Sequence, residues 1–377
     1  MRLALAVLLA STLVATCAEP GASGVPSDGG PADSSGAASS SAASAPAGSD
    51  GPAPSGGSPS VPEGQFLNPV IGRNFADPFV LEVDGTYYAY ATGNLTYNIQ
   101  VTTSTDLVHW ERVRGALPRL PIWQPTSKGL TWAPEVARTD AGFVMHYTGR
   151  DVQAGKQCLA VAVADEPSGP FVDKSREPLF CQHDLGGSID SSPFLDADGT
   201  RYLLWKSDGN CCGIPVRMFI SELADDGLTL IGEPTDLGLA VDAPWERNLI
   251  EAPTLLLHEG TYYLFFSAND YGSRNYAAGY ATSSTVLGPY VDAEENPILA
   301  TDVPVGTAGQ PAGPGHQSII ADDAGDLWIV YHAWDSGLIG DSIGGRRAMW
   351  IDQLVFEDGR PVVKGPDVGP QPAPAAP

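Results

Sequence analysis

The chain has 377 residues, and its 45 aspartates and glutamates against 20 lysines and arginines give it a formal net charge of −25. Such an acidic surface repels nucleic acid and anionic lipid and disfavours both as partners, whereas a neutral polymer meets no repulsion. Beyond residue 17 no segment is apolar enough to cross a bilayer, which disfavours an integral membrane protein.

Residues 1–17 have the composition of a secretory signal. One arginine is followed by a short apolar run and small residues, and the run is too short to span a membrane as a mature helix. It ends at Cys17 after Val14-Ala15-Thr16, which resembles a bacterial lipobox, although Thr16 stands where Gly, Ala or Ser is usual. Two outcomes stay open, a lipid anchor at Cys17 or ordinary cleavage nearby, and both predict a protein outside the cell membrane.

Residues 18–64 consist almost entirely of Ala, Gly, Ser, Pro and Asp. They bury too little apolar surface to offset the entropy of ordering, so we expect a disordered linker. The Pro-rich end, 366–377, is expected to be disordered as well. About 300 residues, 65–365, then remain for the folded part of the chain.

The folded part repeats one pattern. Residues 249–270 read as two strands joined by a Glu-Gly turn, and similar hairpins occur at 76–92, 132–148, 189–206 and 315–333. The steps between their turn glycines are 57, 57, 61 and 65 residues, the glycines being Gly85, Gly142, Gly199, Gly260 and Gly325. Repeats of this length built only of strands are typical of propeller blades.

Further strands support this interpretation. Alternating or apolar segments follow each hairpin, at 99–113, 158–172, 217–230, 278–291 and 347–357, and no stretch has a convincing helical stripe. The sequence therefore predicts an all-β, five-bladed β-propeller over 65–365. It does not show how the ring closes or which residues form the fourth strands.

Four cysteines lie in the predicted domain. In an exported chain Cys158, Cys181, Cys211 and Cys212 permit three disulfide pairings. Cys158 and Cys181 fall in one blade, so we predict a bond between them, which leaves Cys211–Cys212 as a bond between neighbours in the chain. A zinc site is the alternative, but the usual CxxC spacing is absent. A structural role is favoured.

In a propeller the innermost strands of all blades line the central channel in the same direction, so residues at one register form a ring at one mouth. Isolated buried charges cost several kcal/mol unless they are paired or functional. Three carboxylates and a histidine occupy the predicted ring and indicate a functional site. Counting back eight or nine residues from each turn glycine gives Asp77, Ala133-Pro134, Asp190, Glu251 and His316.

The order of the blades assigns roles to the acids. Asp190 and Glu251 come from neighbouring blades, and like charges at close range raise one pKa, which leaves one carboxyl protonated. We expect that one to be Glu251, as general acid, with Asp190 tuning it and holding the sugar. Asp77 should face Glu251 across the mouth and stay ionised as a base. Carboxyls about 6.5–9.5 Å apart leave room for a water and predict inversion at the anomeric carbon.

Five motifs together resemble those of glycoside hydrolase family 43, and the resemblance covers roughly residues 66–365. They are Ala76-Asp77-Pro78, Trp132-Ala133-Pro134-Glu135, Ser188-Ile189-Asp190, Ile250-Glu251-Ala252-Pro253, and Gly315-His316-Gln317-Ser318 with Tyr331-His332-Ala333-Trp334. The resemblance implies a five-bladed propeller that hydrolyses α-L-arabinofuranosides or β-D-xylosides with inversion. It implies Asp77 as base, Asp190 as pKa modulator and Glu251 as acid. It also implies that His316 holds a calcium or other ion together with waters, although one histidine is a poor calcium ligand set by itself.

Other residues near the ring have two interpretations each. Trp132 is predicted to stack on a sugar face, the alternative being a packed core tryptophan. Arg346, or its neighbour Arg347, is predicted to reach a sugar hydroxyl, the alternative being a surface charge. Glu135 could compete as an acid, but it lies past the ring register and is expected to point away from the mouth. His332 is expected to be a packed histidine.

The leading functional prediction is a secreted or lipid-tethered monomeric glycosidase, with no organic cofactor, that acts on plant polysaccharide such as arabinan or arabinoxylan. A β-D-xylosidase on the same scaffold is the nearest alternative. A non-catalytic carbohydrate-binding propeller is a third, which the intact trio of acids disfavours. A fructan-cleaving enzyme is disfavoured because no Asn-Asp-Pro-Asn strand is present.

Overall fold

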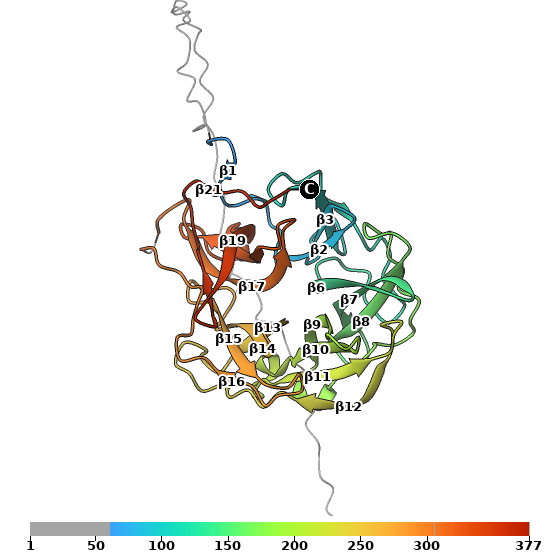
Figure 1. Ribbon diagram of the computed structural model, residues 1–377. Helices are drawn as coiled ribbons and strands as arrows, with labels where there is room; N and C mark the ends of the chain where they lie inside the picture. Colours follow the sequence, from blue (N-terminus) through green and yellow to red (C-terminus); the bar gives the residue numbers. More distant parts are fainter. Residues whose placement is uncertain (1–60, 305, 377) are drawn as a thin grey trace, which may run out of the picture. The chain divides into compact units, whose positions relative to one another are not determined.

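The computed structural model describes residues 61–304 and 306–376. Five antiparallel sheets surround a common centre (Figure 1), so the predicted five-bladed propeller is confirmed. The described residues include no helix long and apolar enough to cross a bilayer. The predicted signal segment and nearly all of the predicted linker lie outside the described residues.

Each blade is one sheet whose strands follow the chain from the centre outward, and blade 2 has three strands where the others have four. Blade 1 comprises β2 (Phe79–Val83), β3 (Thr86–Ala91), β4 (Gln100–Ser104) and β5 (Arg114–Gly115). Blade 2 comprises β6 (Thr131–Thr139), β7 (Gly142–Asp151) and β8 (Lys156–Ala164). Blade 3 comprises β9 (Ser188–Leu195), β10 (Arg201–Ser207), β11 (Met218–Leu223) and β12 (Leu230–Asp236).

Blade 4 comprises β13 (Ile250–His258), β14 (Thr261–Ala268), β15 (Ala277–Ser283) and β16 (Val291–Asp292). Blade 5 comprises β17 (Pro311–Ala321), β18 (Leu327–Asp335), β19 (Ala348–Glu357) and β20 (Arg360–Val363). Within the described part of the chain, three short 3-10 helices lie in loops: η1 (His183–Leu185), η2 (Gly209–Cys212) and η3 (Asp341–Ile343). The fourth strands, which the sequence left open, are therefore β5, β12, β16 and β20.

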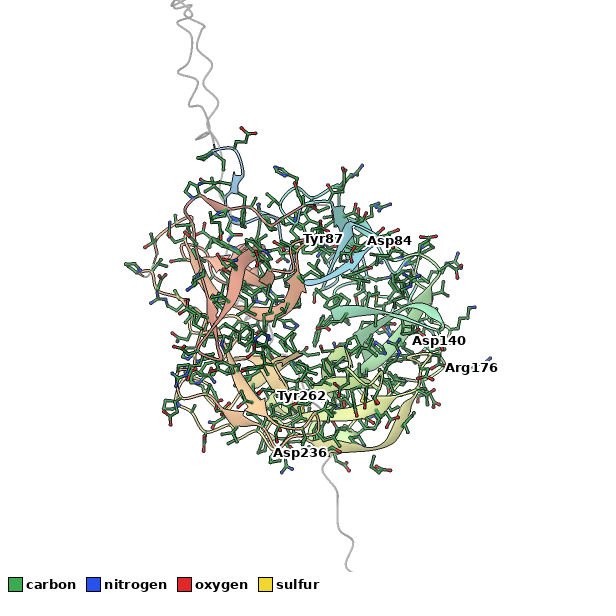
Figure 2. The ribbon with its side chains drawn as sticks, viewed as in Figure 1. Asp84, Tyr87, Asp140, Arg176, Asp236 and Tyr262 are labelled. Carbon is green, nitrogen blue, oxygen red and sulfur yellow. A yellow bond between two sulfur atoms is a disulfide. The ribbon has the colours of Figure 1, made fainter. Side chains whose placement is uncertain are left out.

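The innermost strands β2, β6, β9, β13 and β17 contact one another in turn around the centre (Figure 1). Each pairs with the second strand of its blade through one of the predicted hairpins. Asp84 and Asp140, labelled in Figure 2, lie in the corresponding turns of blades 1 and 2. Because the turns correspond, the opposite ends of the inner strands meet at one mouth.

The core is divided among the contacts between blades. Val80 and Tyr87 of blade 1 pack with Trp328 and Val330 of blade 5, and similar clusters join blades 1 and 2, 3 and 4, and 4 and 5. Burying one large apolar side chain stabilises the fold by roughly 1.5–3 kcal/mol. The second strands read as nearly continuous apolar runs because both of their faces pack against neighbouring blades.

The ring closes through the segment before blade 1, which binds to blade 5. The Asn68 side chain donates to Ile351 O at 2.7 Å and accepts from Ile351 N at 3.0 Å. A separate two-stranded sheet pairs β1 (Gln65–Phe66) with β21 (Gln371–Pro372).

This pairing corrects the expectation of a disordered tail over 366–377. Gln371 is buried and its Nε2 donates to Asp352 at 3.2 Å, while Ala375 N donates to Asp322 Oδ2 at 2.9 Å. The Pro-rich composition did not predict this order, because the tail forms its hydrogen bonds with blade 5 and with β1 rather than among its own residues.

Both predicted disulfides are confirmed. Cys158, at the start of β8, is bonded to Cys181, and Cys211 is bonded to its neighbour Cys212 within η2.

Candidate active site

The ring predicted from the register is visible in the backbone. One residue near the start of each inner strand has a left-handed conformation: Asp77 (φ 55°), Ala133 (φ 44°), Asp190 (φ 57°), Ala252 (φ 56°) and His316 (φ 50°). Such angles are uncommon outside glycine and concentrate at functional sites. In blade 4 the equivalent residue is Ala252, so Glu251 lies one position before it.

The same residues are held by the preceding blade. Ala133 N donates to Thr92 Oγ1 at 2.9 Å, Asp190 N donates to Thr148 Oγ1 at 3.2 Å, and His316 N donates to Ser267 Oγ at 2.8 Å. Asp77 N closes the ring by donating to Nδ1 of His332 at 3.2 Å. The acceptors occupy matching positions at the ends of the second strands, so four of the five blades orient the mouth residue of the next blade in this way.

Asp77 lies beside one arginine and two histidines. Its Oδ1 is 2.9 Å from Nη1 of Arg347 and 3.4 Å from Nδ1 of His316, and its Oδ2 accepts from Thr92 Oγ1. Burial alone would raise the pKa of Asp77, but Arg347, His316 and His332 outweigh it and hold the pKa well below its usual value. Asp77 is therefore ionised near neutral pH, the state that a general base requires.

Asp190 and Glu251 lie beside each other, as their blade order predicted. Oδ2 of Asp190 accepts from Ala252 N at 3.2 Å. Glu251 receives Tyr276 OH on Oε1 at 2.7 Å and Lys206 Nζ on Oε2 at 3.2 Å. All three acids of the mouth are 7–8% exposed, so they are enclosed but in reach of solvent.

The pKa of Asp190 is raised and that of Glu251 is lowered, whereas we expected Glu251 to be the protonated member of the pair. Burial raises the pKa of Asp190 to about 6; Glu251 adds to the rise, and His316 opposes it. Burial would also raise the pKa of Glu251, but Lys206, His316 and the hydrogen bond from Tyr276 lower it below its usual value. Without substrate the extra proton therefore resides on Asp190, because Lys206 and Tyr276 compensate the charge of Glu251.

Sequence reasoning missed these compensating groups. Lys206 and Tyr276 lie in or next to second and third strands, at positions that a packed core would also occupy. Of the two arginines considered, Arg347 enters the site: its guanidinium lies 4.8 Å from the ring of Tyr271 and 5.8 Å from that of Trp334. Arg346, which we favoured as a substrate ligand, is exposed, and among the described residues it forms no hydrogen bond or ion pair.

Trp132 and Glu135 both lie in β6. Trp132 is partly exposed, its Nε1 donating to Gly129 O at 3.0 Å, so stacking on a sugar stays a prediction. Glu135 was expected to point away from the mouth, yet it interacts with Ser192 and Asp190 of the next inner strand. Burial raises the pKa of Glu135 to about 8, the bond from Ser192 opposes the rise, and Asp190 adds to it.

The donor set around His316 does not by itself fit a calcium ion. Calcium takes six to eight oxygen ligands, whereas among the described residues one carboxylate, that of Asp77, lies within 4 Å of the His316 ring nitrogens, and Arg347 already engages it. Within 61–304 and 306–376 the one group of three His, Cys, Asp or Glu donors that could surround an ion is Cys158, Cys181 and His183, and its cysteines form a disulfide. No catalytic step is assigned to a metal.

Comparisons with known proteins agree with this geometry. The sequence model of glycosyl hydrolases family 43 matches residues 66–361. The chain is 26% identical to a β-D-galactofuranosidase of Aspergillus niger over 77% of this chain and 82% of that protein. It is 31% identical to a β-xylosidase of Bacillus subtilis over 71% of this chain and 49% of that protein.

An extracellular endo-α-(1→5)-L-arabinanase of Bacillus subtilis is 26% identical over 59% of this chain and 51% of that protein. The chain thus spans about half the length of these two Bacillus subtilis proteins.

Among solved structures, a thermostable family-43 glycoside hydrolase superimposes with a TM-score of 0.71 at 34% identity, covering 82% of this chain and 99% of that one. An endo-1,4-β-xylanase of Bacteroides thetaiotaomicron superimposes with a TM-score of 0.65 at 28% identity, covering 81% and 99%. The match of the family model over more than half of the chain, together with the propeller and its acidic mouth, shows that this protein belongs to glycoside hydrolase family 43.

Proposed function

We propose that the protein is an inverting glycoside hydrolase that cleaves α-L-arabinofuranosidic linkages in plant cell-wall polysaccharide. The observation that carries the proposal is the division of charge at the mouth. Asp77 is held ionised by Arg347, while Asp190 and Glu251 retain a proton between them up to about pH 6. Hydrolysis with inversion needs one ionised base and one protonated acid on opposite sides of the scissile bond.

Asp77 acts as the base in this proposal. Its carboxylate takes a proton from the attacking water, which adds to the anomeric carbon from the face opposite the leaving group. Thr92, Arg347 and the strand geometry fix the orientation of the carboxylate. A fixed base holds the water near the attack geometry and avoids the entropic cost of assembling it.

Glu251 acts as the acid. The proton of the Asp190–Glu251 pair must reach Glu251 before the glycosidic oxygen departs. When a sugar fills the mouth it displaces water from Glu251, and this desolvation favours the protonated form. Asp190 holds the proton in the free protein, which agrees with a role as pKa modulator rather than as the direct acid.

The arabinofuranosyl preference rests on the sequence motifs and on the relatives named as arabinanases. A β-xylosidase is a second candidate because the Bacillus subtilis β-xylosidase is 31% identical. Trp132 is proposed to stack on the sugar and Arg347, in place of Arg346, to donate to a hydroxyl. Action outside the cell is proposed from residues 1–17 and from the relatives named as extracellular.

The test is a panel of substrates. Aryl α-L-arabinofuranoside, β-D-xyloside and β-D-galactofuranoside are compared by kcat/KM, and products on linear arabinan, branched arabinan, arabinoxylan and xylo-oligosaccharides are identified. We expect the arabinofuranoside and arabinans to be preferred. A preference for the xyloside would replace arabinose by xylose in the proposal. A chelator arm, with calcium added back, tests the ion predicted at His316.

Proton NMR of the first product decides the stereochemistry, and inversion is expected. Glu251→Gln should abolish cleavage of polysaccharide yet retain much more activity on an aryl glycoside whose leaving group needs no acid. Asp77→Asn should lose both activities. Unchanged turnover in Glu251→Gln would reject Glu251 as the acid, and sugar binding without turnover in wild type would favour the non-catalytic carbohydrate-binding propeller instead.

A further inference from the structure

Blade 3 departs from the pattern by which each blade holds the next. The acceptors Thr92, Ser267 and His332 lie seven residues after their turn glycines, and Thr148 lies six after Gly142. Seven residues after Gly199 comes Lys206, which can accept no hydrogen bond when charged. The residue that it should hold, Ala252, instead donates its N–H to Asp190 Oδ2 at 3.2 Å. Because Lys206 does not hold Ala252, its amine can bind another partner.

That partner is the acid of the mouth. Lys206 is 0% exposed, and its Nζ lies 3.2 Å from Glu251 Oε2 and 2.8 Å from Asn210 Oδ1. A buried ammonium must be paired and hydrogen-bonded to be tolerated, so these two contacts together fix where its charge sits. Asn210 is exposed, and its side chain is one of the two groups that anchor Lys206.

Asn210 precedes the bond between the two neighbouring cysteines. It lies in η2, which begins three residues after Lys206 and ends at Cys212, and the turn is closed by Ile214 N donating to Gly209 O at 2.9 Å. The Cys211–Cys212 bond closes a small ring across a single peptide unit, which restricts the backbone dihedrals beside Asn210. Cys211 is exposed, so a solution reagent can reach the bond.

We propose that the Cys211–Cys212 loop is a positioning device for the acid: the disulfide fixes Asn210, Asn210 anchors Lys206, and Lys206 sets the position and protonation of Glu251. The inference depends on the proposed role of Glu251. The three residues are positioning residues, and reduction of the bond by an external dithiol loosens the anchor. In that reaction the dithiol is oxidised to its cyclic disulfide, and its two electrons and two protons convert Cys211 and Cys212 to thiols.

Loss of the Lys206 anchor should shift the pH dependence of kcat/KM. The charged and titratable groups that act on Glu251 are Lys206, Asp190, Asp208, Tyr276, His316 and Tyr271. Among them Lys206 is the strongest influence that favours the ionised carboxylate. Lys206 also lowers the pKa of Asp190, so displacing Lys206 raises the pKa of both members of the Asp190–Glu251 pair. A general acid works only when protonated, so the alkaline limb of kcat/KM moves to higher pH.

The experiment compares pH profiles of kcat/KM for four proteins: wild type, Asn210→Ala, Cys211→Ser/Cys212→Ser, and Asp236→Asn. The last removes the surface ion pair of Arg217 with Asp236, at the outer edge of the same blade (Figure 2), and controls for charge changes far from Glu251. Each protein is measured with and without dithiothreitol, and alkylation with peptide mapping identifies which cysteines are reduced.

We expect the alkaline limb to move up by about half a pH unit or more in Asn210→Ala, in the double serine variant and in wild type with Cys211–Cys212 reduced. The double serine variant should not respond to dithiothreitol, and Asp236→Asn should match wild type. An unmoved limb in folded Asn210→Ala and in reduced wild type would overturn the proposal. Because reduced wild type needs no mutation, a variant that fails to fold leaves the test intact.

A second readout separates this inference from the proposed function. Carbon NMR titration of the glutamate carboxyls, with Glu251→Gln used to assign the signal, measures the pKa of Glu251 without turnover. A raised Glu251 pKa in Asn210→Ala is expected even if another residue proves to be the acid. An unchanged Glu251 pKa together with loss of turnover in Glu251→Gln would reject the positioning device and leave the proposed function standing.

Discussion

Nη1 of Arg347 lies 2.9 Å from Oδ1 of Asp77, although the two residues are 270 positions apart in the chain. Arg347 is the strongest of the groups that lower the pKa of Asp77. Arg347→Ala should raise that pKa, protonate the base in part and reduce kcat/KM by roughly 100-fold or more near neutral pH. Arg347→Lys should fall between, because it keeps the charge but loses the contacts with Tyr271 and Trp334.

The pH profile distinguishes this from loss of folding, since an acidic limb should appear at higher pH in Arg347→Ala than in wild type. Arg346→Ala, measured alongside, is expected to stay within a few-fold of wild type. A larger loss in Arg346→Ala than in Arg347→Ala would restore Arg346 as the functional arginine.

The alkaline limb of wild-type kcat/KM should lie near pH 6, because kcat/KM reports the free protein, in which the pKa of Asp190 is about 6. Above this pH the Asp190–Glu251 pair loses its shared proton, and the acid must be protonated, so the rate falls with rising pH. Asp77 stays ionised across the same range because its pKa is well below normal. Rates on polysaccharide and on an activated aryl glycoside are compared from pH 4 to 9.

The limb should be much weaker with the activated substrate, whose leaving group needs no acid. A rate on polysaccharide that instead climbs as the pH increases through 6 would contradict the assignment.

His146 makes the fold less stable in acid. It is fully buried, its Nε2 lies 2.9 Å from Gly227 O, and burial lowers its pKa to about 4 although this bond opposes the shift. The unfolded chain binds a proton near pH 6.5 that the fold excludes, so stability is complete above 6.5 and is lost as the pH falls toward 4. The loss between pH 7 and 5 should be about 2 kcal/mol.

His332, whose pKa burial also lowers to about 4, contributes a similar loss. His146→Gln keeps a donor for Gly227 O, so between pH 7 and 5 its free energy of unfolding should fall by about 2 kcal/mol less than that of wild type, measured by urea unfolding at each pH. His183→Gln, at an exposed histidine, is measured in the same way as the matched control.

The ordered tail should stabilise the ring. Truncation after residue 366 removes the pairing of β21 with β1 and the hydrogen bonds from Gln371 and Ala375 to blade 5. At roughly 0.5–1.5 kcal/mol for each hydrogen bond, the free energy of unfolding should fall by about 2–4 kcal/mol. Thermal and urea unfolding measure it, and kcat at 25 °C should be retained. A Tm equal to that of a chain lacking only the last two residues would show that the tail contributes nothing.

The sequence by itself determined the blade count and the ring of mouth residues. A propeller repeats one hairpin around an axis, so residues at the same sequence separation from their turn glycines lie at the same height in the ring. Asp77, Asp190 and Glu251 could therefore be assigned to one mouth from the sequence. The Cys158–Cys181 bond followed from the same repeat, because both residues fall within one blade.

Only the tertiary structure decided how the acids are charged. Arg347 reaches Asp77 across the closure of the ring, and Lys206 reaches Glu251 from the neighbouring blade. A pKa depends on burial and on the distances to nearby charges, and the pattern of residues along a strand shows neither. For that reason the sequence placed the carboxylates, whereas the folded ring decided which of them holds the proton.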